Sequence, residues 1–231
     1  TRVLVLAGGR DFWSNGLHLN VIEAADSPAD ESWRNINAMD DLTEAVIRTT
    51  DRLTVAALGA NAGAGGVFLA LAADYVMARH GVVLNPHYKN MGNLYGSEFW
   101  TYLLPRRAGE QGAREVMAQR LPLGAEAALR TGLADIVGPR DPDDFAAYWR
   151  QRADTLAGDA KLDHRLAAKS QRLAADEAEQ PLADYRAAEL ERMGLNFYGF
   201  DPSYHVTRYR FVHRWPHAWT PRHLAIHRRL G

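Results

Sequence analysis

Residues 59 to 74 constrain the fold more than any other stretch, because they place a glycine-rich turn between two apolar segments. The residues before the turn, Leu53 to Leu58, are typical of a buried strand, and those after Gly66 of a buried helix. Such a turn points backbone N–H groups at an anion or a polarised oxygen, although it equally suits close packing of helix on strand. No Gly-x-x-x-x-Gly-Lys-Ser/Thr sequence supports a nucleotide phosphate loop.

Strand-like and helical segments alternate along the first part of the chain, which predicts an α/β fold. We expect strands at 2–9, 53–58, 75–78, 82–85 and 133–137, and helices at 29–51, 66–74, 109–120 and 124–131. The helix over 29–51 should bury its residues at helical spacing, Trp33, Ile36, Met39, Leu42 and Val46. Because the chain opens on an apparently central strand, the sequence also predicts that N-terminal strands are missing.

From Pro142 onward the pattern is helical, so we divide the chain into a core over 1–140 and a helical C-terminal region over 141–231. A charged break at 177–181 could begin a separate subregion. After Asp201 no acidic residue occurs, whereas six arginines and five histidines do, among aromatic residues that include Trp219. This basic and aromatic tail suits packing against another domain or reaching a phosphorylated cofactor better than binding nucleic acid, for which no motif is present.

Composition excludes several classes of protein. The 27 basic and 28 acidic residues nearly balance, so the overall charge does not indicate a polyanionic partner. The absence of cysteine excludes disulfides and thiolate chemistry. The nine histidines form no metal-binding spacing, so no metal site is predicted. No apolar run of about 18 residues spans a membrane and no signal peptide opens the chain. The sequence therefore predicts a cytoplasmic protein with neither nucleic-acid nor membrane partners; its oligomeric state stays open.

The segment from Pro86 to Trp100 holds acid, base and hydroxyl candidates on a loop that leads into a helix. Loops on a rigid scaffold are where catalytic residues concentrate. His87, Tyr88 and Glu98 are the candidates in this segment. Glu98 equally suits the first turn of the helix that begins near Ser97, where acidic residues are common.

Residues 1 to about 140 resemble the crotonase (enoyl-CoA hydratase/isomerase) superfamily. The family's first oxyanion loop is matched by Phe12-Trp13-Ser14-Asn15-Gly16-Leu17-His18, and its second by Ala62-Gly63-Ala64-Gly65-Gly66-Val67-Phe68-Leu69-Ala70. The resemblance implies a ββα spiral core and a coenzyme A (CoA) thioester whose oxygen is held by the N–H groups of Leu17 and Gly65. Residues implied to contact CoA are Ser14, Asn15, Gly16, Leu17, Leu19, Gly65 and Gly66.

Two departures from the family pattern bear on the reaction. One glutamate position of the hydratases is Phe68 here, and the other, in the family's Pro-Glu, is His87. Adding water across a double bond needs paired acid and base groups. The sequence therefore predicts a crotonase fold that is not a hydratase.

Several longer strings are similar to the C-terminal half of HoxX-type hydrogenase maturation proteins: Glu31-Ser32-Trp33-Arg34-Asn35-Ile36-Asn37, Asn85-Pro86-His87-Tyr88-Lys89, Leu94-Tyr95-Gly96-Ser97-Glu98 and Trp100-Thr101-Tyr102-Leu103-Leu104-Pro105-Arg106-Arg107. That family joins a formyl-tetrahydrofolate-using domain, absent from this sequence, to a crotonase-like domain. The resemblance implies conversion of formyl-CoA to CO and CoA, with the CO becoming a ligand of [NiFe] hydrogenase, and it implies the hydrogenase maturation machinery as partner.

That chemistry needs a base near the formyl carbon and a proton for the leaving sulfur. We assign Glu98 as the base and Tyr88 as the hydrogen-bond or proton donor, with His87 as the alternative base. Tyr95, Phe99 and Trp100 could form an apolar wall that raises the pKa of the carboxyl group. Alternative functions are another acyl-CoA enzyme, such as a decarboxylase or thioesterase, and a non-catalytic CoA-binding domain.

Overall fold

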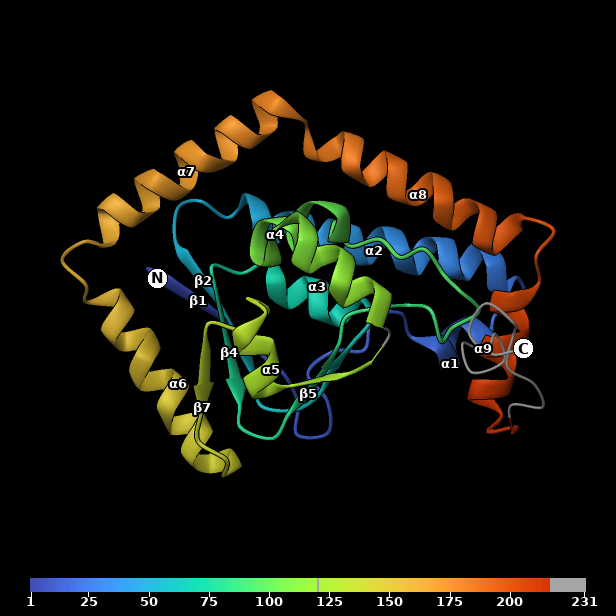
Figure 1. Ribbon diagram of the computed structural model, residues 1–231, viewed down its shortest axis with the longest axis horizontal. Coiled ribbons are helices and arrows are strands. Elements are labelled where there is room, and N and C mark those ends of the chain that lie inside the picture. The colour runs from blue at the N-terminus through green and yellow to red at the C-terminus, as the bar shows by residue number, and fades with distance from the viewer. Residues whose placement is uncertain (120, 217–231) are drawn as a thin grey trace.

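The computed structural model describes residues 1–119 and 121–216, and its core is a parallel sheet (Figure 1). The sheet contains β1 (Val3–Ala7), β2 (Leu53–Leu58), β4 (Tyr75–Arg79) and β7 (Ile136–Gly138), hydrogen-bonded in the order β1-β2-β4-β7 and parallel throughout. The strands expected at 2–9, 53–58 and 75–78 are therefore confirmed, and so is the α/β class. The strand expected at 133–137 begins only at Ile136, and the first strand, which was expected to be central, lies at the edge of the described sheet and is only partly buried.

The central strand β2 is buried along its whole length because both faces of the sheet are covered. Its alternate side chains Ala56 and Leu58 face the main core, which holds α2 (Pro28–Arg48) and α3 (Gly65–Leu71). Val55 and Ala57 face the other way, against Phe145 of α6 (Pro142–Ala157). This arrangement explains why β2 is apolar on both faces apart from Thr54, which hydrogen-bonds Asp74, instead of alternating apolar and polar residues.

A smaller three-stranded sheet carries the segments around the glycine-rich turn. It contains β3 (Ala62–Gly63), β5 (Val83–Asn85) and β6 (Leu123–Gly124) in the order β3-β5-β6. The strand β3 pairs in parallel with β5, and β5 pairs antiparallel with β6. The helix expected at 66–74 is α3, which begins at Gly65 and ends at Leu71, and the short strand β3 just before it was not expected. The first N–H groups of α3 therefore emerge beside this sheet.

Two helices differ from expectation. The helix expected at 109–120 is the second part of α4 (Trp100–Gln119), which is interrupted at Gly109, where φ is 71°. In α2 the expected burial of Leu42 is wrong, since this side chain is 45% exposed. The buried face of α2 instead combines the polar residues Ser32, Asp40 and Thr43 with the apolar residues Ile36, Val46 and Ile47. Its start is fixed by Ser27, whose hydroxyl accepts the N–H of Asp30.

The remaining described helices surround this core (Figure 1). They are α1 (Leu19–Glu23), α5 (Ala125–Arg130), α6, α7 (Leu162–Glu179), α8 (Leu182–Tyr198) and α9 (Ser203–Val212). Of the break expected at 177–181, residues 177–179 still belong to α7, so only Gln180 and Pro181 separate α7 from α8. The helix α8 packs on α2 and α4, and α9 packs on α1 and α8. The basic and aromatic tail is thus anchored as far as α9, whereas Trp219 and its neighbours lie outside the described residues. Within the described chain, no helix combines the length and apolarity needed to cross a membrane.

Candidate active site

Two loops that are distant in the sequence meet at the N-terminus of α3. The N–H of Gly63 donates to the carbonyl oxygen of Ser14 at 2.9 Å, and the N–H of Trp13 donates to the oxygen of Asn61 at 2.8 Å. A Cβ added at Gly66 would overlap the backbone of Ser14, so only glycine allows this approach. The loop over 12–17 is therefore fixed beside the first turn of α3.

A cavity of about 370 Å³ opens at this junction. It brings together most of the residues that the sequence singled out: Asn15, Leu17, Leu19, Gly65, His87, Tyr88 and Glu98. Ser14, Gly16 and Gly66 stand behind this lining and build the junction itself; a Cβ on Gly16 would lie 3.1 Å from the nitrogen of Gly65. Within the described residues, the N–H groups of Leu17 and Gly65 donate no hydrogen bond to another residue.

Glu98 and Tyr88 form a pair inside this cavity. The hydroxyl oxygen of Tyr88 lies 2.6 Å from Oε2 of Glu98 and 3.0 Å from the carbonyl oxygen of Ser97. The other carboxyl oxygen, Oε1, is buried and has no hydrogen-bond partner in the described chain. The carboxyl group lies against Gly65, since a Cβ there would overlap it. One oxygen of Glu98 is thus held by Tyr88, and the other stands beside the start of α3.

Burial raises the pKa of Glu98 to about 8, and the negative charges of Asp40 and Glu189 act in the same direction. The hydrogen bond from Tyr88 acts in the opposite direction. Burial and the charge of Glu98 raise the pKa of Tyr88 well above its usual value, so the phenol stays protonated. With a raised pKa, the protonated and the ionised forms of Glu98 are both accessible near neutral pH. A carboxyl group in this state can accept a proton and release it again near neutral pH.

Glu98 occupies a strained turn ahead of α4. Its φ is 60° and that of Phe99 is 58°, in the left-handed region that residues other than glycine rarely adopt. Each such residue costs on the order of 1 kcal/mol, and such strain clusters at functional sites. The interpretation of Glu98 as a helix cap does not account for a fully buried carboxyl group that faces a cavity.

The aromatic wall differs in part from the one expected. Phe68 stacks on the ring of Tyr88 with centroids 5.7 Å apart and an interplanar angle of 24°. Trp100 packs on Phe68 and on Tyr95, and Phe99 is fully buried, but none of the expected residues Tyr95, Phe99 and Trp100 is among the described residues that line the cavity. The aromatic contact to the Tyr88 ring comes instead from Phe68.

The sequence did not single out several residues of the site. Asn85 lines the cavity with a buried side-chain oxygen that has no described partner. Met193 of α8 and Phe211 of α9 close the cavity from the C-terminal region. Asp40 and Glu189 are fully buried behind Glu98. The sequence did contain a signal for Asp40: this acidic residue lies at helical spacing from Ile36 and Ile47, on the side of α2 that is buried.

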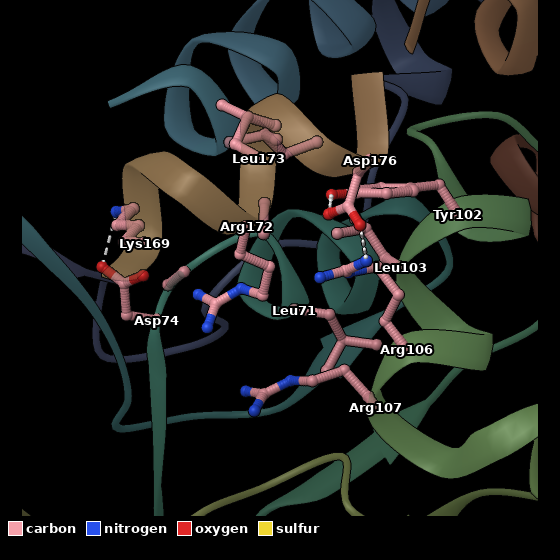
Figure 2. A pocket seen from close by; sticks show the side chains of 13 residues that line it. Leu71, Asp74, Tyr102, Leu103, Arg106, Arg107, Lys169, Arg172, Leu173 and Asp176 are labelled. Atoms are coloured by element: carbon pink, nitrogen blue, oxygen red, sulfur yellow. Dashed lines mark hydrogen bonds and ion pairs between the residues drawn. The ribbon is translucent and has the colours of Figure 1, made fainter. Parts of the chain in front are cut away.

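A second cavity, of about 310 Å³, lies at the opposite end of α3 and is lined by cations (Figure 2). Most of its charge is matched by carboxylates: Lys169 contacts Asp74 at 2.6 Å and Arg106 contacts Asp176 at 2.7 Å. Arg107 binds Asp135 at 2.9 Å. The carboxyl and phenol pair of Glu98 and Tyr88 lines the first cavity, which is therefore the candidate active site.

The stability of the protein is expected to fall as the pH rises from about 5 to 8. Glu98 has a folded-state pKa of about 8, above its ordinary value of 4.5, so the folded state binds the proton more tightly than the unfolded state does. The stabilising contribution is complete below pH 4.5 and is lost as the pH rises through 8. Urea denaturation gives the free energy of unfolding at pH 5.5 and at pH 8. Between these pH values it should decrease more in wild type than in Glu98→Gln, by on the order of 1 kcal/mol. Equal decreases would contradict the raised pKa.

Comparison with known proteins agrees with this architecture. The family model described as enoyl-CoA hydratase/isomerase matches residues 1–219. The chain is 60% identical over 228 residues to the hydrogenase maturation factor HoxX of Bradyrhizobium diazoefficiens, covering 99% of this chain and 40% of that protein. Crystal structures of HypX from Aquifex aeolicus superpose on it with TM-scores of 0.93 and, for a complex with tetrahydrofolic acid, 0.91. Both are 52% identical, and the match covers 100% of this chain and 41% of theirs.

An enoyl-CoA hydratase from Mycobacterium avium subsp. paratuberculosis shares the fold at 21% identity, with a TM-score of 0.73 over 90% of this chain and 79% of that one. The chain thus spans about two fifths of the length of HoxX and of HypX. Within that span it carries the two loops and the α/β core described above. The chain belongs to the enoyl-CoA hydratase/isomerase (crotonase) family and, over nearly its whole length, is a homologue of the hydrogenase maturation factor HoxX and of HypX.

Proposed function

We propose that the protein releases CO from formyl-CoA and returns free CoA. The observation that carries the proposal is the Glu98 and Tyr88 pair, whose unpartnered carboxyl oxygen stands beside the N-terminus of α3. The N–H groups of Leu17 and Gly65 are the donors for the thioester oxygen. Donors fixed in place before the reaction can each lower a barrier by about 3 kcal/mol.

The reaction moves one proton and breaks two bonds. Oε1 of ionised Glu98 takes the formyl hydrogen as a proton, and the electron pair of the C–H bond becomes the lone pair on the carbon of CO. The C–S bond breaks with its electrons going to sulfur, and protonated Glu98 then returns the proton to the thiolate. No oxidant or reductant is needed, because formyl-CoA and the products CO and CoA contain the same atoms. Tyr88 holds Oε2 throughout, which leaves Oε1 directed at the substrate.

The homologues support the proposal about the partners of the reaction. A HypX structure was determined with tetrahydrofolic acid, and HoxX is a hydrogenase maturation factor. We therefore propose that an N-terminal formyl-transfer domain supplies formyl-CoA from formyl-tetrahydrofolate, and that the CO becomes a ligand of [NiFe] hydrogenase. The cytoplasm, where that machinery acts, is the proposed location.

Incubation with formyl-CoA tests this function, with CO detected by the optical spectrum of a haem protein and formate measured in parallel. CO in equal amount to released CoA is the expected result. Formate in place of CO would identify a thioesterase instead. Binding of CoA without turnover of formyl-CoA would identify a non-catalytic CoA-binding domain.

Tyr88→Phe is expected to reduce CO formation less than loss of Glu98 does. The hydroxyl lowers the pKa of Glu98 through its hydrogen bond, so its removal should raise that pKa and move the rising limb of the pH profile to higher pH. Rates of CO release between pH 6 and 10 measure the shift. An unchanged pH profile would show that Tyr88 does not act on the base.

Crotonyl-CoA should not be hydrated at a useful rate. Phe68 and His87 occupy the positions of the two carboxylates that the hydratases use, and the Phe68 ring is packed against Tyr88. Loss of absorbance from the conjugated thioester measures hydration. A turnover above about 1 s⁻¹, the low end for ordinary enzymes, would contradict this expectation. Phe68→Glu alone should not create the activity, since the second carboxylate is still absent.

A further inference from the structure

Asp40 of α2 accepts hydrogen bonds from the turn that contains Glu98. Its Oδ1 accepts the backbone N–H of Glu98 at 2.8 Å, and both of its oxygens lie 2.9 Å from the hydroxyl oxygen of Ser97. Asp40 and Ser97 are fully buried. These bonds are therefore made without competition from water, and the backbone N–H of Glu98 points at Asp40 and not into the cavity.

Glu189, on α8, holds the same segment from the other side. Its Oε2 accepts the N–H of Phe99 at 2.9 Å. Its Oε1 accepts both the N–H of Thr101 at 2.8 Å and the hydroxyl of Thr101 at 2.6 Å. Glu189 thus satisfies N–H groups at the start of α4 that have no carbonyl partner within the helix.

These bonds explain how a strained backbone persists. Left-handed conformations at Glu98 and Phe99 need surrounding structure that leaves the segment no better alternative. The N–H of Glu98 donates to buried Asp40 of α2, 58 residues away in the sequence. The N–H of Phe99 donates to buried Glu189 of α8, 90 residues away. If the turn relaxed, the carboxyl group of Glu98 would leave its place against Gly65 and Tyr88.

We propose that Asp40 and Glu189 are positioning residues, which hold Glu98 in the geometry that the reaction requires through their hydrogen bonds to the segment over 97–101. Only the catalytic consequence rests on the proposed function; the positioning itself can be measured without turnover. The charged and titratable groups around Glu98 are Tyr88, Asp40 and Glu189, with His87 in the lining of the same cavity and Arg186 behind Asp40 at 3.8 Å. Removing either carboxylate takes away a neighbouring negative charge and loosens the burial of Glu98, and both changes lower its pKa.

The test uses Asp40→Asn, Glu189→Gln and Glu189→Ala, with the exposed α8 residues Asp184→Asn and Glu191→Gln as matched controls. Carboxyl ¹³C NMR gives the pKa of Glu98, and amide hydrogen exchange reports on Glu98 and Phe99. We expect the pKa of Glu98 to fall by about one unit or more in the three variants, with faster exchange at the turn. Glu189→Gln should lie between wild type and Glu189→Ala, because an amide oxygen still accepts one of the N–H groups.

Turnover provides the second readout. The kcat for CO release should fall at least about tenfold with little change in KM, since a small displacement of a reacting group lowers the rate more than it lowers binding. Unchanged pKa and exchange at Glu98 in folded Asp40→Asn and Glu189→Ala, or effects no larger than those of the controls, would overturn the proposal. If wild type releases no CO while the pKa and exchange respond, the proposed function fails and the positioning stands.

Two milder variants cover the case in which a carboxylate variant does not fold. Thr101→Val removes one donor to Glu189, and Ser97→Ala removes the hydroxyl shared with Asp40. Each should shift the pKa of Glu98 in the same direction by a smaller amount. No shift in either variant would equally overturn the proposal.

Discussion

Glu98→Gln is expected to lower CO release from formyl-CoA by about 10²- to 10⁴-fold, which is the usual cost of removing a general base. Glutamine keeps the shape of the side chain, and its amide oxygen can still accept from Tyr88. It cannot take the formyl proton. CoA affinity should barely change, because the N–H groups of Leu17 and Gly65 are untouched. CO formation, CoA titration and thermal unfolding of the same preparations separate these effects.

The matched control is Glu110→Gln, an exposed carboxylate on α4, which should retain wild-type activity. If Glu98 only capped the helix, Glu98→Gln would lower stability by about 1 kcal/mol or less and leave turnover intact. Full activity in Glu98→Gln would therefore end its assignment as the base and return attention to His87, which lines the same cavity.

Gly65→Ala is expected to abolish most CO formation without unfolding the protein. The backbone of Gly65 has no left-handed φ, so alanine fits the local conformation, but its Cβ would overlap the carboxyl group of Glu98. The carboxyl group must move, and the N–H beside it becomes obstructed. We expect a loss of at least about 10²-fold, because the variant disturbs the base and an oxyanion donor together. Overpacking should also cost about 1 to 3 kcal/mol of stability.

Gly59→Ala is the control for this substitution. It lies in the same glycine-rich turn, and its added Cβ would meet only the ring of Phe145 at 3.9 Å, an ordinary contact. CO release and urea denaturation should be close to wild type. If Gly65→Ala kept full activity with Glu98 displaced in its crystal structure, the proposed place of the reaction at the start of α3 would be wrong.

Local patterns carried much of the fold and of the site. Apolar runs identified β2 and β4, because strands covered on both faces need continuous apolar residues. The glycines over 59–66 and the loop over 12–17 identified the junction, since each motif is contiguous in the sequence. Tyr88 and Glu98 stood out for the same reason: they lie ten residues apart on one polar and aromatic loop.

The burial pattern of α2 was decided by packing. Periodicity alone predicts an apolar stripe, yet Leu42 is exposed and Asp40 is buried. Asp40 is buried because the strained turn at Glu98 supplies N–H and hydroxyl donors that need an acceptor, and those donors come from a loop 58 residues later. No helical pattern within α2 contains that information.

The sequence by itself determined the α/β core, the glycine-rich turn and the candidate residues Tyr88 and Glu98, because propensity, periodicity and contiguous motifs are local properties. Only the tertiary structure decided that Phe68 stacks on Tyr88, that α8 and α9 line the cavity, and that Asp40 and Glu189 accept the N–H groups of Glu98 and Phe99. Their partners are brought together by the chain's long-range packing. Buried donors and acceptors must find each other wherever the fold places them, so their pairing becomes visible only in three dimensions.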